Sequence, residues 1–212
     1  MKKKIGFYDY TVILTYLGFA LAFAGILNTM NERHWDAILC LIMAGVCDMF
    51  DGAVAATKKR SPQEKRFGIQ IDSLSDLVSF GILPAVFVYK FSDGESLVGV
   101  LCMVYALCAL IRLAYYNVLE EQRQNAEDGE RNSYLGLPVT VIALLLPAAF
   151  LLYDEQIIKS RMIFYALIAI VGAAFISPFE VRKPKIIGKI ILLIVAAIEA
   201  IALTALALWG SV

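Results

Sequence analysis

The sequence has few of the side chains that soluble metal-binding and thiol enzymes use. Its 212 residues include one histidine, His34, and four cysteines, Cys40, Cys47, Cys102 and Cys108. No two cysteines form a Cys-x-x-Cys pair, and none has a histidine or second cysteine nearby at the spacing of a zinc site. We therefore interpret the cysteines as small buried apolar residues and expect no catalytic role for His34.

Excess charge and polar segments are also missing. The 19 Lys and Arg residues balance the 19 Asp and Glu residues, so the charge total gives no reason to expect a nucleic-acid partner. The chain has no low-complexity stretch, no convincing repeat and no polar segment long enough for a soluble domain. Apolar residues make up 60% of it, against about 45–50% in a soluble domain. We expect a single membrane domain over residues 1–212.

The apolar residues form seven runs, each close to the roughly 20 residues that cross a bilayer as a helix. The first run follows Lys2–Lys4 as in a signal peptide, but 20 uncharged residues from Thr11 to Met30 favour an uncleaved helix. The last run contains Glu199, so it could instead form two short or re-entrant segments. We predict an all-α polytopic helix bundle with spans at about 10–30, 35–57, 70–90, 96–118, 134–153, 162–179 and 186–210.

Positive charges alternate between the two sides of this arrangement. With the N-terminus inside, 14 of the 19 Lys and Arg residues fall in inside segments and four outside. This asymmetry predicts a cytoplasmic 58–67 loop. Near the last span the basic residues are Arg182, Lys183, Lys185 and Lys189, which we attribute to topology and to attraction by anionic lipids, with contact to a lipid phosphate as the alternative.

Four aspartates flank the 58–67 loop. Asp48 and Asp51 are three residues apart and Asp72 and Asp76 are four apart, so each pair shares one helix face. The short loop makes the two helices antiparallel neighbours and puts both pairs at the same depth. We therefore predict that four carboxylates converge near the cytoplasmic boundary.

Such a cluster needs neutralisation, because membrane-buried acids are costly and like charges repel. Oxygen-only ligands favour hard divalent ions, Mg²⁺ or Mn²⁺, or Ca²⁺ in a looser cage. Two ions bridged by carboxylates would hold a diphosphate during an in-line displacement. The structural alternative is a solvated helix end for Asp48 and Asp51 and a helix cap for Asp72, which leaves Asp76 unexplained.

Three small residues adjoin the aspartates. Gly52 and Ala55 lie one turn apart, and we expect Gly68 to open the third helix. Their lack of bulk would let a ligand approach the backbone, and close helix packing is the alternative.

Written as one pattern, the residues are Asp48-x2-Asp51-Gly52-x2-Ala55, then Gly68-x3-Asp72-x3-Asp76. This resembles the signature of the CDP-alcohol phosphotransferase family. The resemblance covers about residues 10–180 and implies a six-helix core, usually dimeric, to which the C-terminal apolar segment at about 186–210 is added. The family usually has Arg where this chain has Ala56, and the gap before Gly68 is about three residues longer here. The candidates to replace that Arg are Lys58, Lys59, Arg60, Lys65 and Arg66.

Within the family, three stretches resemble the phosphatidylserine synthases. They run from Gln70 to Ala85, from Arg112 to Asn117 and from Tyr134 to Pro138. The resemblance implies CDP-diacylglycerol as donor, L-serine as acceptor, and phosphatidylserine and CMP as products. It also implies a bacterial or archaeal cell membrane, with the site on the cytoplasmic side.

The resemblance assigns roles by position. Asp48, Asp51 and Asp72 would bind two divalent ions, and Asp76 would be the general base and also a metal ligand. The cytidine diphosphate site would include Gly52, Ala55, Gly68, Lys59 and Arg66.

Two residues are candidates for binding the acceptor or a phosphate. Arg112 is the one cation well inside a predicted span, and its bidentate fork suits either anion. Snorkelling of Arg112 to the interface is the alternative. Asn117 follows about one turn later, where it would share the site or face the headgroups.

Other activities stay open at this point. Within the family, the acceptor could be glycerol 3-phosphate or an inositol phosphate. Membrane prenyltransferases also bind diphosphates through metal-bound aspartates, but the framework of Gly52, Ala55 and Gly68 is not expected in them. A cation-coupled transporter is a third class, although transporters favour repeats and midplane sites.

Overall fold

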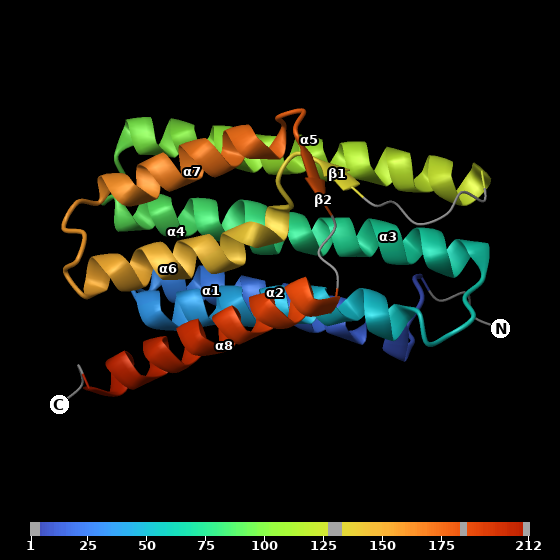
Figure 1. The fold of residues 1–212 in the computed structure, drawn as a ribbon, viewed down its shortest axis with the longest axis horizontal. Coiled ribbons are helices and arrows are strands. Elements are labelled where there is room, and N and C mark those ends of the chain that lie inside the picture. The colour runs from blue at the N-terminus through green and yellow to red at the C-terminus, as the bar shows by residue number, and fades with distance from the viewer. Residues whose placement is uncertain (1–4, 127–132, 183–185, 210–212) are drawn as a thin grey trace.

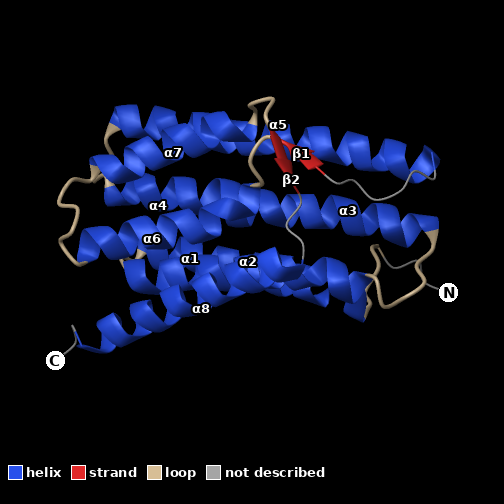
Figure 2. Cartoon of the chain, viewed as in Figure 1, coloured by secondary structure: helices blue, strands red, loops and turns tan. Residues whose placement is uncertain are grey.

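The computed structural model describes residues 5–126, 133–182 and 186–209, and its helices lie lengthwise beside one another (Figures 1 and 2). A short 3-10 turn at Tyr10–Val12 leads into the first helix. The helices are α1 (Ile13–Met30), α2 (His34–Ala55), α3 (Pro62–Asp76), α4 (Leu83–Phe91), α5 (Ser96–Ala126), α6 (Ile142–Asp154), α7 (Met162–Phe175) and α8 (Ile186–Trp209). A π-helical segment, η2 (Leu77–Ile82), joins α3 to α4 without a break.

Four helical segments are long and apolar enough to cross a membrane: Tyr10–Met30, His34–Ala55, Pro62–Phe91 and Ser96–Gln122. Three shorter apolar segments follow, at Val139–Asp154, Met162–Phe175 and Ile190–Leu206. The prediction of a polytopic membrane helix bundle is therefore confirmed. The last predicted run is one helix, α8, rather than two re-entrant pieces.

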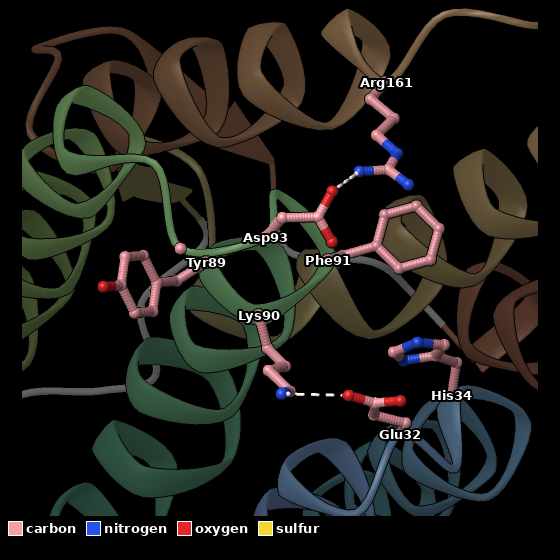
Figure 3. Close-up of a pocket in the computed structure, with 8 residues that line it drawn as sticks. Glu32, His34, Tyr89, Lys90, Phe91, Asp93 and Arg161 are labelled. Carbon is pink, nitrogen blue, oxygen red and sulfur yellow. Dashed lines mark hydrogen bonds and ion pairs between the residues drawn. The ribbon is translucent and has the colours of Figure 1, made fainter.

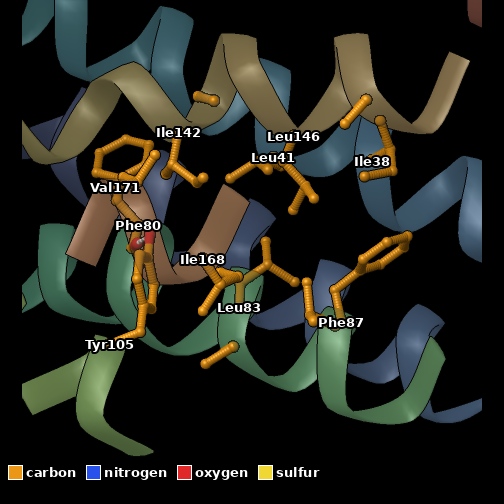
Figure 4. Close-up of a cluster of buried hydrophobic side chains, with 14 of the residues drawn as sticks. Ile38, Leu41, Phe80, Leu83, Phe87, Tyr105, Ile142, Leu146, Ile168 and Val171 are labelled. Carbon is orange, nitrogen blue, oxygen red and sulfur yellow. Dashed lines mark hydrogen bonds between the residues drawn. The ribbon is translucent and has the colours of Figure 1, made fainter. Parts of the chain in front are cut away.

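The continuous α3–η2–α4 helix lies between α5 on one side and the α1–α2 pair on the other (Figure 1). Buried side chains on its second half, including Phe80, Leu83 and Phe87, meet residues of α2, α5, α6 and α7 (Figure 4). Helix α8 packs against α2 and α6. The three cysteines Cys47, Cys102 and Cys108 are buried and Cys40 is half-buried, all as free thiols, which agrees with their interpretation as apolar residues.

The third helix begins earlier than the sequence analysis predicted. Ser61 and Glu64 form a capping box, with Pro62 in the first turn, so the helix begins at Pro62. The connecting loop is therefore only residues 56–61, and Gly68 lies in the second turn of α3 instead of opening it. The first two turns of α3 are polar, so a search of the sequence for long apolar runs does not detect them.

The fifth predicted span was also placed wrongly at its start. Ser133–Leu135 (β1) pairs antiparallel with Glu180–Arg182 (β2), and the α6 segment begins only at Val139–Val141, a 3-10 turn after Pro138. Gly136 turns the chain between them with φ of +69°, and a Cβ there would lie 2.6 Å from the Phe175 carbonyl oxygen. A side chain is therefore excluded at this turn.

Part of the charge pattern lies outside the described residues. These positions are Lys2–Lys4, Arg131, Lys183 and Lys185.

Candidate active site

The two aspartate pairs meet where the end of α2 lies beside α3. One carboxylate oxygen from each of Asp48, Asp72 and Asp76 falls within 4.8 Å of the others. All three residues are partly buried. The i, i+4 spacing on α3 and the six-residue loop produce this convergence, because the loop reverses the chain and brings the aspartates of α3 opposite the end of α2.

Asp51 adjoins this group rather than belonging to the tight set of three. Its carboxyl group lies close to that of Asp72, and the Thr15 hydroxyl donates a 3.3 Å hydrogen bond to its Oδ2. The Ser75 hydroxyl in turn donates to the Thr15 carbonyl oxygen at 3.2 Å. Helix α1 therefore braces the cluster from a third side, through a threonine that the sequence analysis did not single out and that carries no periodic signal within an apolar run.

The donor set fits a hard divalent cation. It consists of carboxylate oxygens alone, which suits Mg²⁺, Mn²⁺ or Ca²⁺ and not the nitrogen- and sulfur-binding metals. Four carboxyl groups at these distances repel one another unless protons or cations lie between them. Neither structural alternative accounts for this arrangement, since Asp72 lies in the interior of α3 and α2 continues beyond Asp51 to Ala55.

The small residues of the signature have different surroundings. A Cβ on Gly52 would meet nothing within 4 Å, so the space beside the end of α2 is open to a ligand. Ala55 is the last residue of α2 and is half-buried. A Cβ on Gly68 would lie 2.9 Å from a guanidinium nitrogen of Arg60.

The predicted cations of the 56–61 loop and of α3 are also placed differently. Lys58 forms ion pairs with Asp9, at 2.6 Å, and with Glu64, at 3.1 Å. Lys59 is exposed. Arg66 is exposed and lies 3.9 Å from Glu121 of α5.

Arg112 and Asn117 both contact backbone or side chains of neighbouring elements. Arg112 is 7% exposed, and its Nη1 donates a 2.7 Å hydrogen bond to the Leu135 carbonyl oxygen. Its guanidinium lies 4.5 Å from the centre of the Tyr116 ring. Arg112 therefore anchors β1 and does not snorkel to the interface. Asn117 accepts a 2.6 Å hydrogen bond from the Ser73 hydroxyl.

A cavity of about 410 Å³ lies at the far end of the bundle (Figure 3). His34 lines it, and Lys90–Glu32 and Arg161–Asp93 ion pairs join the loops around it. Asp48 is 14 residues along α2 from His34, or about 20 Å of helix. The single histidine is therefore remote from the carboxylates.

Comparison with known proteins identifies the family. The CDP-alcohol phosphatidyltransferase family model matches residues 10–209. The chain belongs to this family. It is therefore a transferase, which removes the transporter and the prenyltransferase as alternatives, and the matched range includes α8.

Three relatives have names that specify serine. A CDP-diacylglycerol–serine O-phosphatidyltransferase of Methanocaldococcus jannaschii is 29% identical over 197 residues, covering 92% of this chain and 82% of the relative. One of Saccharomyces cerevisiae is 32% identical, over 68% of this chain and 50% of the relative. An archaetidylserine synthase of Methanothermobacter thermautotrophicus is 28% identical, over 71% of this chain and 61% of the relative. The chain thus spans most of the first relative but half to three-fifths of the other two.

Proposed function

We propose that this membrane transferase moves a phosphatidyl group from CDP-diacylglycerol to the hydroxyl of L-serine, giving phosphatidylserine and CMP. The observation that carries the proposal is the convergence of Asp48, Asp72 and Asp76, with Asp51 beside them, at the signature positions of the family. The acceptor rests on the relatives, because the names of the two archaeal proteins and of the yeast protein all specify serine.

In this mechanism Asp48, Asp51, Asp72 and Asp76 would hold two divalent ions, Mg²⁺ or Mn²⁺. Such ions would supply neutralisation of the diphosphate charge. The open space beside Gly52 accommodates the donor headgroup, next to Ala55.

The reaction itself exchanges one phosphorus–oxygen bond for another. The serine hydroxyl oxygen attacks the phosphorus that carries the diacylglycerol, and the bond from that phosphorus to the CMP oxygen breaks. Asp76 takes the hydroxyl proton as general base, and CMP leaves with the electron pair. Asp76 suits this role because it lies on the same face of α3 as Asp72, one turn further from the polar start of the helix at Pro62.

The orientation and the assembly belong to the same proposal. Lys58, Lys59 and Arg60 in the loop beside the cluster favour the cytoplasmic side, where serine and a soluble nucleotide product are available. We expect a homodimer in a bacterial or archaeal cell membrane, as the resemblance implies, and mass measurement in native detergent checks the dimer.

The test is an assay of purified protein in detergent with CDP-diacylglycerol and labelled L-serine, followed by thin-layer separation of the lipids. We expect a phosphatidylserine product and CMP release that are both abolished by EDTA and restored by Mn²⁺ or Mg²⁺. CMP release with glycerol 3-phosphate or an inositol phosphate, but not with serine, would replace the acceptor and keep the reaction. Metal-independent turnover would contradict the role of the aspartates.

A further inference from the structure

The α2–α3 loop carries three cations beside an acidic cluster, and their surroundings differ. The Lys58 ammonium is already neutralised by Asp9 and Glu64, and Lys59 extends into solvent. Arg60 is half-buried, and among the described residues it has no ion-pair partner. Of the three, Arg60 alone combines partial burial with an unneutralised charge.

The guanidinium of Arg60 lies directly against α3. One of its nitrogens comes within 2.9 Å of where a Cβ on Gly68 would be, so any side chain at position 68 would displace it. Gly68, Asp72 and Asp76 are spaced four residues apart and therefore form one stripe along α3. The Arg60 guanidinium thus lies against the aspartate-bearing face of α3 at Gly68, which is one turn, or about 6 Å along the helix axis, before Asp72.

The other two cations near the cluster, Lys65 and Arg66 on the first turns of α3, do not lie against Gly68 as Arg60 does. Arg66 is six residues before Asp72, which turns it about 120° away from the stripe, and it faces Glu121. Lys65 shares the face of the stripe but lies about two turns from Asp72, and helical side chains lean toward the N-terminus and so away from the cluster. Lys65 is also exposed.

Charge balance gives Arg60 a role. Two divalent ions would match the charge of four carboxylates and leave the negative charge of a bound diphosphate uncompensated. A guanidinium binds phosphate oxygens through two parallel hydrogen bonds and remains charged at all relevant pH values. An unneutralised Arg at the edge of the cluster supplies the missing charge where a donor diphosphate would enter beside Gly52.

We propose that Arg60 binds the diphosphate of the CDP-activated donor, and that Gly68 is a glycine because the Arg60 guanidinium occupies the space of its side chain. The proposal rests on the proposed function and assigns to Arg60 the cation that position 56, an alanine, lacks. It also revises the prediction for Gly68, which makes room for a protein side chain rather than for the ligand itself.

The experiment measures CDP binding by calorimetry in detergent with Mn²⁺, and the KM for CDP-diacylglycerol, for wild type, Arg60→Gln and Lys65→Gln. We expect Arg60→Gln to weaken CDP binding and raise that KM by about tenfold to a hundredfold, the value of a charge-assisted hydrogen-bonded contact. The KM for serine should change by less than about twofold, since the proposal places Arg60 at the donor diphosphate and not at the acceptor. Lys65→Gln, the matched loss of a neighbouring cation, should bind CDP like wild type.

Two further variants separate a local effect from misfolding. Gly68→Ala keeps every charge and favours the helix, yet we expect it to weaken CDP binding by displacing Arg60, with no additional effect in the Arg60→Gln background. Ala56→Arg should restore CDP binding to Arg60→Gln, by returning a cation to the end of α2.

The outcomes distinguish the two proposals. Wild-type protein that binds no CDP in the presence of metal would sink the proposed function itself. Wild-type binding that Arg60→Gln leaves unchanged, or that Lys65→Gln weakens instead, would overturn the assignment of Arg60 and leave the function intact. Additive effects of Gly68→Ala and Arg60→Gln would contradict the link between these two residues.

Discussion

The Tyr105 hydroxyl of α5 donates a 2.7 Å hydrogen bond to the Phe80 carbonyl oxygen, inside the π-helical segment that follows Asp76 (Figure 4). A π-helix replaces the regular i to i−4 hydrogen bonds by i to i−5 hydrogen bonds, and the residue four positions after Phe80 is Pro84, which has no N–H to donate. Tyr105 is 1% exposed and provides a donor from a neighbouring helix. The contact therefore fixes an irregular turn one residue beyond the proposed general base.

Replacing Tyr105 by Phe removes this hydrogen bond and leaves the carbonyl group buried without a partner. We expect Tyr105→Phe to lower the free energy of unfolding by about 1–2 kcal/mol. We also expect a lower kcat, because the helix register after Asp76 is less constrained. Equilibrium unfolding in detergent and the serine assay check the two effects. Tyr115→Phe, an exposed tyrosine on the same helix, is the control and should change neither.

Asp76→Asn tests the general base. The amide keeps the size of the side chain but cannot take a proton, so turnover should fall by at least about a hundredfold. Folding and CDP binding in the presence of metal should persist, because Asp48, Asp51 and Asp72 remain. Asp36→Asn, at the exposed start of α2, is the control. Turnover equal to wild type in Asp76→Asn would remove Asp76 from the base role.

The convergence of the aspartates was predictable because it depends on local rules. Spacings of three and four residues determine which side chains share a helix face, and a short loop brings two consecutive helices together. The same rules placed five of the seven apolar helices close to their observed starts. The third helix begins earlier than predicted, at Pro62. The fifth begins later because β1 pairs with β2 through residues about 45 positions apart, and such pairing leaves no signal in a local pattern.

Other differences between the predicted and the observed structure arose at features that a search for apolar runs does not detect. Ser61, Pro62 and Glu64 form a standard helix start, yet the turns that follow are charged and resemble a loop in hydropathy. The π-helix at Leu77–Ile82 has no periodicity of its own. Arg60 could not be selected among five nearby cations from sequence, because only the fold shows which of them turns toward Gly68.

The N-terminal segment is tied to the Arg60 loop by a charge pair that should depend on pH. Lys58, together with the hydroxyl and amide of Thr11, lowers the pKa of Asp9 from 3.8 to about 2. The pKa of Lys58 is raised by Asp9 and Glu64, so its ammonium stays charged throughout the acidic range. A depressed carboxyl pKa stabilises the folded state above the ordinary value, and this contribution is lost as the pH falls toward the folded value.

We therefore expect the Asp9→Asn variant to unfold at a lower temperature than wild type above about pH 4.5. The difference in unfolding temperature should shrink between about pH 4 and pH 2. Thermal unfolding in detergent across this range measures it. Lys58→Gln should reproduce the loss, and the double variant should add nothing further. A difference between wild type and Asp9→Asn that does not vary with pH would show that the pair does not stabilise this segment.

The last prediction concerns Ser73 and Asn117, which join α3 to α5. The Ser73 hydroxyl donates to Asn117 at 2.6 Å, and the Asn117 amide donates to Gln70 at 3.4 Å. Ser73 and Gln70 lie about 100° and 160° around α3 from Asp72, so Asn117 contacts a face of α3 other than the aspartate stripe. This position suits a brace that sets the rotation of α3 better than it suits an acceptor ligand.

A double-mutant cycle separates the two roles. We expect Ser73→Ala and Asn117→Ala each to lower the free energy of unfolding, with a coupling energy of about 1 kcal/mol between them. The KM for serine should stay within about twofold of wild type, while kcat falls because the aspartates of α3 are less well aligned with those of α2. Gln122→Ala, an exposed residue further along α5, controls for truncation of a polar side chain. A selective rise in the KM for serine in Asn117→Ala, with no coupling to Ser73, would instead place Asn117 in the acceptor site.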